Sequence, residues 1–211
     1  MRRLVNKYGI ANVSISLICC LAFIGNCLFI TKDSLLNISD NIAVAYLLNF
    51  LAGCEGVLGK WGCMSYSLAI EQLQLWRAVT NAYLHAGIFH MAFNISALLA
   101  VGKYVEKRIG TAVYLLAYHA ITIIGAIIGC FIFTTSTSVG ASVGIFGIIG
   151  IALVMCFKKQ LKFKKSELVY LIIFVIASVM GLETVVFHIL GLAFGVIFGL
   201  IVIRKNDAKS D

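Results

Sequence analysis

The chain has 211 residues, of which 61% are hydrophobic and only 12% are charged, and its mean hydropathy is +1.01. Soluble domains carry about 25% charged residues, so this composition excludes an ordinary soluble globular protein and indicates a polytopic membrane protein. The net charge of +8 does not indicate nucleic-acid binding, because the basic residues flank apolar segments and form no basic face with interleaved aromatic residues.

Six apolar segments reach or approach the length of about 20 residues that a membrane-spanning helix needs. The first, 10–30, follows a basic leader but has no small-x-small cleavage site, so we expect it to remain as the first span. Further spans are predicted at 87–105, 112–133, 141–157, 168–181 and 184–203. The predicted fold is an all-α polytopic membrane protein, a six-transmembrane-helix bundle that forms a single domain over 1–211 with short tails at 1–9 and 204–211.

A long loop, 31–86, separates the first two predicted spans. Within it, 42–54 is apolar but too short to cross a bilayer, so we expect it to lie in the interface or to dip into the bundle. Cys54 and Cys63 share this loop, where they are either free thiols or a disulfide outside the cytoplasm. The loop itself is either a functional element or a passive extracellular cap.

Lysine and arginine are distributed very unequally between the two sides of the predicted bundle. The segments 1–9, 103–110, 158–167 and 204–211 hold fourteen of them, whereas 31–86, 134–140 and 182–183 hold three. Cytoplasmic loops carry the excess of basic residues, so both termini are predicted to be cytoplasmic. A bacterial plasma membrane is expected, because the chain is compact and has no organellar leader.

Polar residues of three predicted spans fall at a similar depth, near the outer ends of these spans. Ser142 opens the fourth span, and His188 lies about one turn into the sixth. His90 and Asn94 are four residues apart, and hence on one face of the second span. A lone histidine in a membrane helix can be a packing donor or a proton relay, and a lone Gly-x-Ser-x-Gly recurs often in apolar helices. Together these residues predict a functional site, because polar groups in hydrocarbon are costly.

Two stripes of small residues offer a reason for the fourth and sixth spans to touch. His188 shares a stripe with Gly191, Gly195 and Gly199, while the fourth span carries Gly140, Gly144 and Gly147 at similar spacing. Small residues let helix backbones approach closely in membranes. Packing through these stripes is predicted to bring Ser142 and His188 within reach of each other.

These motifs together resemble the rhomboid family of intramembrane serine proteases. The matching residues lie within about 70–200 and read Gly140-x-Ser142, His188-x-x-Gly191-x-x-x-Gly195 and His85-x4-His90-x3-Asn94, with Trp76-Arg77, Glu106, Gly110 and Phe146 as further matches. There are two departures from the usual pattern. Val143 follows the serine where the family usually has glycine, and Phe187 precedes the histidine where it usually has a small residue.

The resemblance implies an endopeptidase that cleaves transmembrane segments by acyl transfer. Ser142 would be the nucleophile and His188 its base, with His90, Asn94 and the Ser142 backbone N–H stabilising the oxyanion. Phe146 would stack on the imidazole. His85 is either a surface histidine or a holder of water and of the first loop.

The resemblance implies that the substrates are single-span membrane proteins within the bilayer. No nucleic-acid partner is expected. No metal or other cofactor is expected, because metal-ligand spacing is absent from the sequence. Two alternatives stay open: a catalytically weak rhomboid-like binder of membrane proteins, and a small channel or transporter lined by His90, Asn94 and His188.

Overall fold

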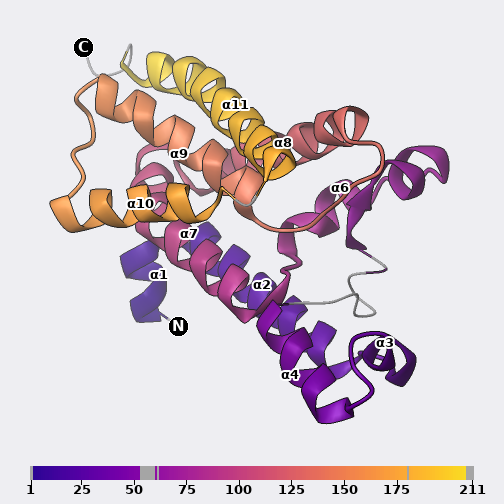
Figure 1. Ribbon diagram of the computed structural model, residues 1–211. Helices are drawn as coiled ribbons and strands as arrows, with labels where there is room; N and C mark the ends of the chain where they lie inside the picture. The colour runs from indigo at the N-terminus through magenta and orange to yellow at the C-terminus, as the bar shows by residue number, and fades with distance from the viewer. Residues whose placement is uncertain (1, 53–59, 61, 180, 208–211) are drawn as a thin grey trace.

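The computed structural model describes residues 2–52, 60, 62–179 and 181–207 (Figure 1). A helix covers most of each segment that was predicted to span the membrane. The helices are α2 (Ile10–Leu28), α7 (Gly87–Ile109), α8 (Thr111–Ile132), α9 (Ser142–Phe157), α10 (Lys165–Ala177) and α11 (Leu182–Asp207). A further short helix, α1 (Arg2–Tyr8), precedes α2.

Within the described residues, four helices are long and apolar enough to cross a bilayer: α2, α7, α8 and α11. They make the chain a multi-pass membrane protein. Helices α9 and α10 have 16 and 13 residues, fewer than the roughly 20 that a full crossing needs. The predicted count of six spans therefore stays a prediction, although all six helices exist.

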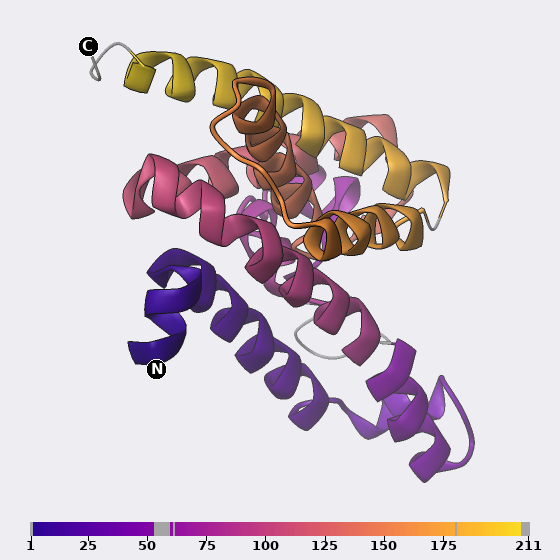
Figure 2. The same cartoon turned by 90° about the vertical axis from the view of Figure 1, so that its left-hand side faces the viewer.

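Helix α9 lies at the centre of the bundle, and twelve of its sixteen residues are buried. Its side chains after Ser142 are apolar all round, which is typical of a helix without a solvent-facing side. α2 runs alongside α7, on the other side of the bundle from α11 (Figure 2). α10 buries only two residues, Leu171 and Phe174, so most of its surface faces outward.

Glycines bring the backbones of α9 and α11 into direct contact. A Cβ atom added at Gly195 would overlap the carbonyl oxygen of Gly147 and lie 2.7 Å from its Cα. A Cβ at Gly150 would lie 2.5 Å from the carbonyl oxygen of Leu192. The prediction that the Gly191 and Gly195 side of α11 packs on α9 is therefore confirmed.

The predicted glycine stripe of α9 packs on α11 only in part: the backbone of Gly147 contacts Gly195, but the open sides of Gly144 and Gly147 face α8. A Cβ at Gly144 would meet Tyr118 and Thr122 of α8, and one at Gly147 would meet Ile121 of the same helix. These glycines therefore make room for large α8 side chains. The glycine spacing alone did not distinguish the two neighbours, because α9 is enclosed on several sides.

The long loop folds into short elements: α3 (Lys32–Leu36), α4 (Ile42–Ala52), β1 (Met64–Ser65), η1 (Ser67–Glu71), α6 (Arg77–Thr80) and η2 (Asn81–Tyr83). The apolar segment predicted at 42–54 is α4, whereas Cys54 and its pairing lie outside the described residues. Strand β1 pairs antiparallel with β2 (Thr137–Ser138), with Met64 opposite Ser138. This pairing joins the loop to the segment that leads into Ser142.

Arg77 holds the loop together from inside. Its side chain is buried, and its guanidinium donates to the carbonyl oxygens of Lys60 at 2.7 Å and Cys63 at 2.9 Å. Nε donates to Oε1 of Gln74 at 2.7 Å. The rigid fork of donors in arginine suits this role, because it satisfies several carbonyls at once. Trp76, next to it, is half exposed.

Glu106, near the end of α7, caps the start of α2. Its buried carboxylate accepts from the backbone N–H groups of Ala11 at 2.9 Å and Asn12 at 3.0 Å, and from Oγ1 of Thr111 at 2.9 Å. Gly9 has φ +89° and faces the carboxylate, which a Cβ there would overlap. Free N–H groups at a helix start favour a negative charge, so this contact fixes α2 against α7.

Glu106→Gln is expected to destabilise the protein, because an amide keeps one acceptor oxygen where the carboxylate uses two. A buried N–H left without a partner costs about 1–3 kcal/mol. For a protein of this size, each kcal/mol lowers the Tm by roughly 2–4 °C. Thermal unfolding in detergent measures the shift. Glu71→Gln, at an exposed position, is the matched control, and equal Tm values for both variants would contradict the capping role.

Candidate active site

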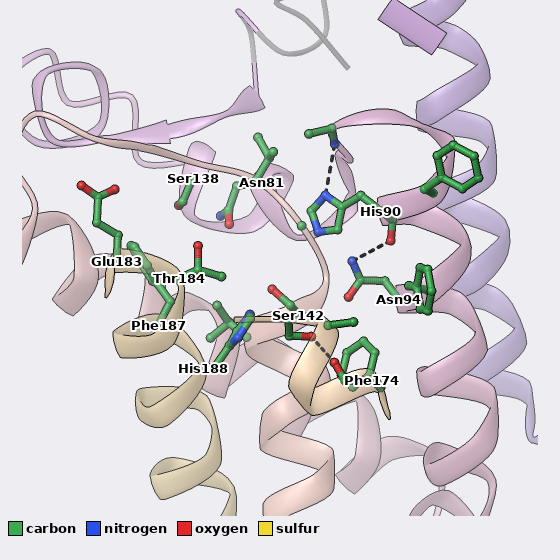
Figure 3. Close-up of a pocket in the computed structure, with 18 of the residues that line it drawn as sticks. Asn81, His90, Asn94, Ser138, Ser142, Phe174, Glu183, Thr184, Phe187 and His188 are labelled. Carbon is green, nitrogen blue, oxygen red and sulfur yellow. Dashed lines mark hydrogen bonds between the residues drawn. The ribbon is translucent and has the colours of Figure 1, made fainter. Parts of the chain in front are cut away.

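A cavity of about 590 Å³ opens where the first turns of α7, α9 and α11 meet the end of α10 (Figure 3). Five of the predicted site residues line it: His90, Asn94, Gly140, Ser142 and His188. In Figure 3, Ser142 lies between His188 on one side and His90 with Asn94 on the other. The cavity thus gathers polar side chains from three helices that are separate in sequence.

Ser142 is the first residue of α9, and the backbone before it is tightly constrained. Gly140 has φ +129°, a conformation that favours glycine, and its N–H donates to the carbonyl oxygen of Asn81 at 2.9 Å. A Cβ at Gly140 would lie 2.9 Å from Cε1 of His90. Glycine is therefore required here by both conformation and space. The helix start also leaves the first backbone N–H groups of α9 without intrahelical acceptors, and Ser142 and Val143 in this first turn line the cavity.

The imidazole of His188 stacks on the ring of Phe146. The ring centroids are 4.1 Å apart, with an interplanar angle of 10°. Phe146 packs in turn on Phe174 of α10, with centroids 5.6 Å apart. His188 is buried, so its ring orientation is fixed by this stack and by the close approach of α11 to α9.

The hydrogen bonds of His90 define which ring nitrogen carries the proton. Its Nδ1 accepts from the backbone N–H of Ala86 at 3.3 Å. In a neutral imidazole the other nitrogen, Nε2, is then the donor. Nε2 faces Gly140, where an added Cβ would be 3.0 Å away. His90 thus directs an N–H toward the backbone that leads into Ser142.

Asn94 uses one of its two amide N–H groups to donate to the carbonyl oxygen of His90 at 3.0 Å. Its Oδ1 is buried and has no hydrogen-bond partner among the described residues. The second N–H of Nδ2 is not needed for that bond. The amide therefore brings both a donor and an unsatisfied acceptor to the cavity wall.

His85 does not line the cavity but lies directly behind His90. It is buried, with ring centroids 5.1 Å apart in an edge-to-face contact, so the alternative of a surface histidine was wrong. Burial, together with the neighbouring His90, lowers the pKa of His85 to about 3 despite the hydrogen bond from Nδ1 to the carbonyl oxygen of Tyr83. His85 is therefore neutral near pH 7, with its Nε2 as an acceptor.

The short helix η2 supports the site through three successive carbonyl groups. Asn81 accepts from Gly140, Ala82 accepts from the hydroxyl of Tyr118 at 3.4 Å, and Tyr83 accepts from His85. The side chain of Tyr83 also hydrogen-bonds to His119 of α8. Sequence reasoning missed this support, because backbone acceptors leave no mark on residue type.

The remaining predicted residues lie around the cavity without lining it. Gly191 and Gly195 pack on α9, Phe146 lies beneath His188, and Trp76 and Arg77 belong to the loop. Several lining residues were not predicted: Asn81, Ser138, Phe174, Glu183 and Thr184. Thr184 could have been placed near the cavity from the sequence, because it begins the sixth predicted span at the same membrane depth as the other site residues.

Comparison with known proteins identifies the chain's relatives. Residues 72–205 match the profile of the Rhomboid domain. The chain is 35% identical over 160 residues to "Rhomboid protease GluP" of Bacillus subtilis, covering 73% of this chain but only 29% of that protein. It is 28% identical to "Putative rhomboid protease YdcA" of the same bacterium, covering 79% of this chain and 87% of that protein.

A plant relative carries a different description. "Inactive RHOMBOID-like protein 8" of Arabidopsis thaliana is 28% identical over 100 residues, which is 47% of this chain and 28% of that protein. The chain therefore spans less than a third of two of the curated relatives it matches. The Rhomboid domain match covers more than half of the chain, and the chain belongs to the rhomboid family.

Proposed function

We propose that this protein is an intramembrane serine endopeptidase that cleaves transmembrane segments of other membrane proteins. The observation that carries the proposal is the shared cavity of Ser142 and His188, with His90 and Asn94 on its opposite wall. A nucleophile, a base and hydrogen-bond donors around one cavity are the set that acyl transfer requires. Similarity to GluP and YdcA, described as a rhomboid protease and a putative one, supports the same activity.

In the proposed reaction, Oγ of Ser142 attacks the scissile carbonyl carbon while His188 takes its proton. The carbonyl oxygen becomes an oxyanion that accepts from Nε2–H of His90, the free N–H of Asn94 and the backbone N–H of Ser142. His188 then returns the proton to the leaving amine, and the acyl-enzyme remains. Water attacks this ester with His188 again as base, which regenerates Ser142.

The stacking of Phe146 supports the role of His188. The soluble triads orient the histidine with an aspartate, whereas the carboxylate among the described lining residues, Glu183, is exposed to solvent. A ring stacked at 4.1 Å instead limits rotation of the imidazole and adds no charge. This arrangement supports a Ser–His dyad.

The proposed substrates are single-span membrane proteins that approach from the lipid. Exposed apolar residues of α7 and α10 line the cavity on one side, namely Phe89, Phe93 and Ala177. An apolar segment can pass such residues without losing its lipid-like surroundings. The proposed topology is one domain with six spans in a bacterial plasma membrane. The distribution of Lys and Arg supports the placement of both termini in the cytoplasm.

Purified protein in detergent tests the proposal without a membrane. The wild type and Ser142→Ala are incubated with a single-span reporter protein and, separately, with a fluorophosphonate probe that labels reactive serines. We expect reporter cleavage and labelling by the wild type only. Labelling of Ser142→Ala at the wild-type level would show that another serine reacts.

The same experiment separates the alternatives. A catalytically weak binder of membrane proteins would retain the reporter in a pull-down but yield no product. A channel or transporter would neither cleave nor retain the reporter. Its activity would be detected only in a sealed vesicle with a gradient.

A further inference from the structure

Val143 and Phe187, which depart from the usual rhomboid pattern, directly adjoin the proposed reacting pair. Val143 follows Ser142 in α9, and Phe187 precedes His188 in α11. Both side chains line the cavity while being only 6% and 9% exposed. They therefore occupy space beside the atoms that would react.

Each of the two side chains sits over a glycine of α8. A Cβ at Gly129 would overlap the ring of Phe187, and a Cβ at Gly125 would lie 2.7 Å from Cγ1 of Val143. The two glycines are four residues apart, so they lie on one face of α8. Together they form a shallow groove that receives both side chains.

The groove fixes where these side chains end and where the cavity begins. The ring of Phe187 rests on Gly129 on one side and packs on Phe133, with centroids 6.2 Å apart, on another. Val143 is equally fixed, because its carbonyl oxygen lies against Gly191. Neither side chain can move back to admit a larger group, since densely packed interiors resist such shifts.

We propose that Phe187, together with Val143, determines the size of the substrate side chain accepted beside the scissile bond. The proposal rests on the proposed endopeptidase function, because it assigns a wall of the same site. A side chain that enters the cavity next to Ser142 meets this wall, so small residues fit and large ones overlap it. Gly129 and Gly125 act as positioning residues, since they hold the wall without touching the substrate.

Phe187→Ala is expected to widen the range of side-chain sizes that the site accepts next to the scissile bond. The test uses reporters that carry glycine, alanine, leucine or phenylalanine on either side of the cleaved bond, and compares kcat/KM for leucine with kcat/KM for alanine. One methylene in a tight pocket changes this ratio by about 10–200-fold, so removal of a ring is expected to raise it by at least tenfold. Phe131→Ala, an exposed α8 residue outside the cavity, is the matched control and should leave the ratio unchanged.

A second pair of variants tests the groove itself. Gly129→Ala places a methyl group under the Phe187 ring and pushes it toward the cavity, so the leucine-to-alanine ratio should fall. Adding Phe187→Ala to Gly129→Ala should restore the ratio of Phe187→Ala alone. General damage to the fold cannot produce this rescue, because the double variant carries both changes.

The outcomes separate the inference from the function on which it rests. If the wild type cleaves no reporter and the probe does not label it at Ser142, the proposed function fails. If the wild type cleaves and is labelled, but Phe187→Ala has the wild-type ratio, the function stands and the assignment of the wall is overturned.

Discussion

We expect three variants to cleave the reporter at the same residual rate, roughly 10⁴–10⁶-fold below the wild type. They are Ser142→Ala, His188→Ala and the double variant that carries both changes. The nucleophile and its base act as one unit, so removal of either leaves nothing for the second substitution to remove. Both line one cavity, and the ring of His188 is held by Phe146. Reporter cleavage in detergent at matched protein concentration measures all three variants.

Ser138→Ala is the matched control for this series. Ser138 lines the same cavity, but its position in β2 is held by pairing with Met64 rather than by its hydroxyl group. We expect its activity to remain within a few-fold of the wild type. If the double variant were tenfold slower than either single variant, Ser142 and His188 would contribute independently, and a dyad mechanism would be excluded.

The helices were predictable because a membrane imposes strong rules on sequence. Apolar runs bounded by basic loops located α2 and α8 to within two residues at each end. α7 continues four residues beyond its predicted end, through Glu106, because that carboxylate is used to cap α2 and is not exposed to lipid. A hydropathy pattern places the end of a span at such a carboxylate, because the pattern does not reveal the hydrogen-bond partners of the carboxylate.

The group of polar site residues could also be predicted from the sequence, because few other polar residues interrupt the predicted spans. Ser142, His188, His90 and Asn94 do meet at one cavity. The contacts that support these residues could not be predicted from the sequence. The carbonyl oxygens of η2 and the groove of Gly125 and Gly129 depend on distant elements, and neither has a characteristic local pattern.

Gly195→Ala is expected to cause the largest loss of stability among single glycine substitutions in α11. In an exposed helix, alanine in place of glycine stabilises by up to about 1 kcal/mol. Here the new methyl group would overlap the backbone of Gly147, which cannot rotate away as a side chain can. Overpacking costs about 1–3 kcal/mol when side chains yield, so a rigid backbone puts Gly195→Ala at or above the top of that range.

Gly199→Ala provides the graded control within the same helix. Its Cβ would lie 3.1 Å from Cα of Ile151, so a shift of a few tenths of an ångström relieves the contact. The Tm in detergent should therefore fall strongly for Gly195→Ala and little for Gly199→Ala. Cleavage should fall in the same order, because Gly195 lies two turns from His188 and α11 can accommodate the methyl group only by moving away from α9. A Tm for Gly195→Ala above that of the wild type would mean that helix propensity, rather than backbone contact, governs this interface.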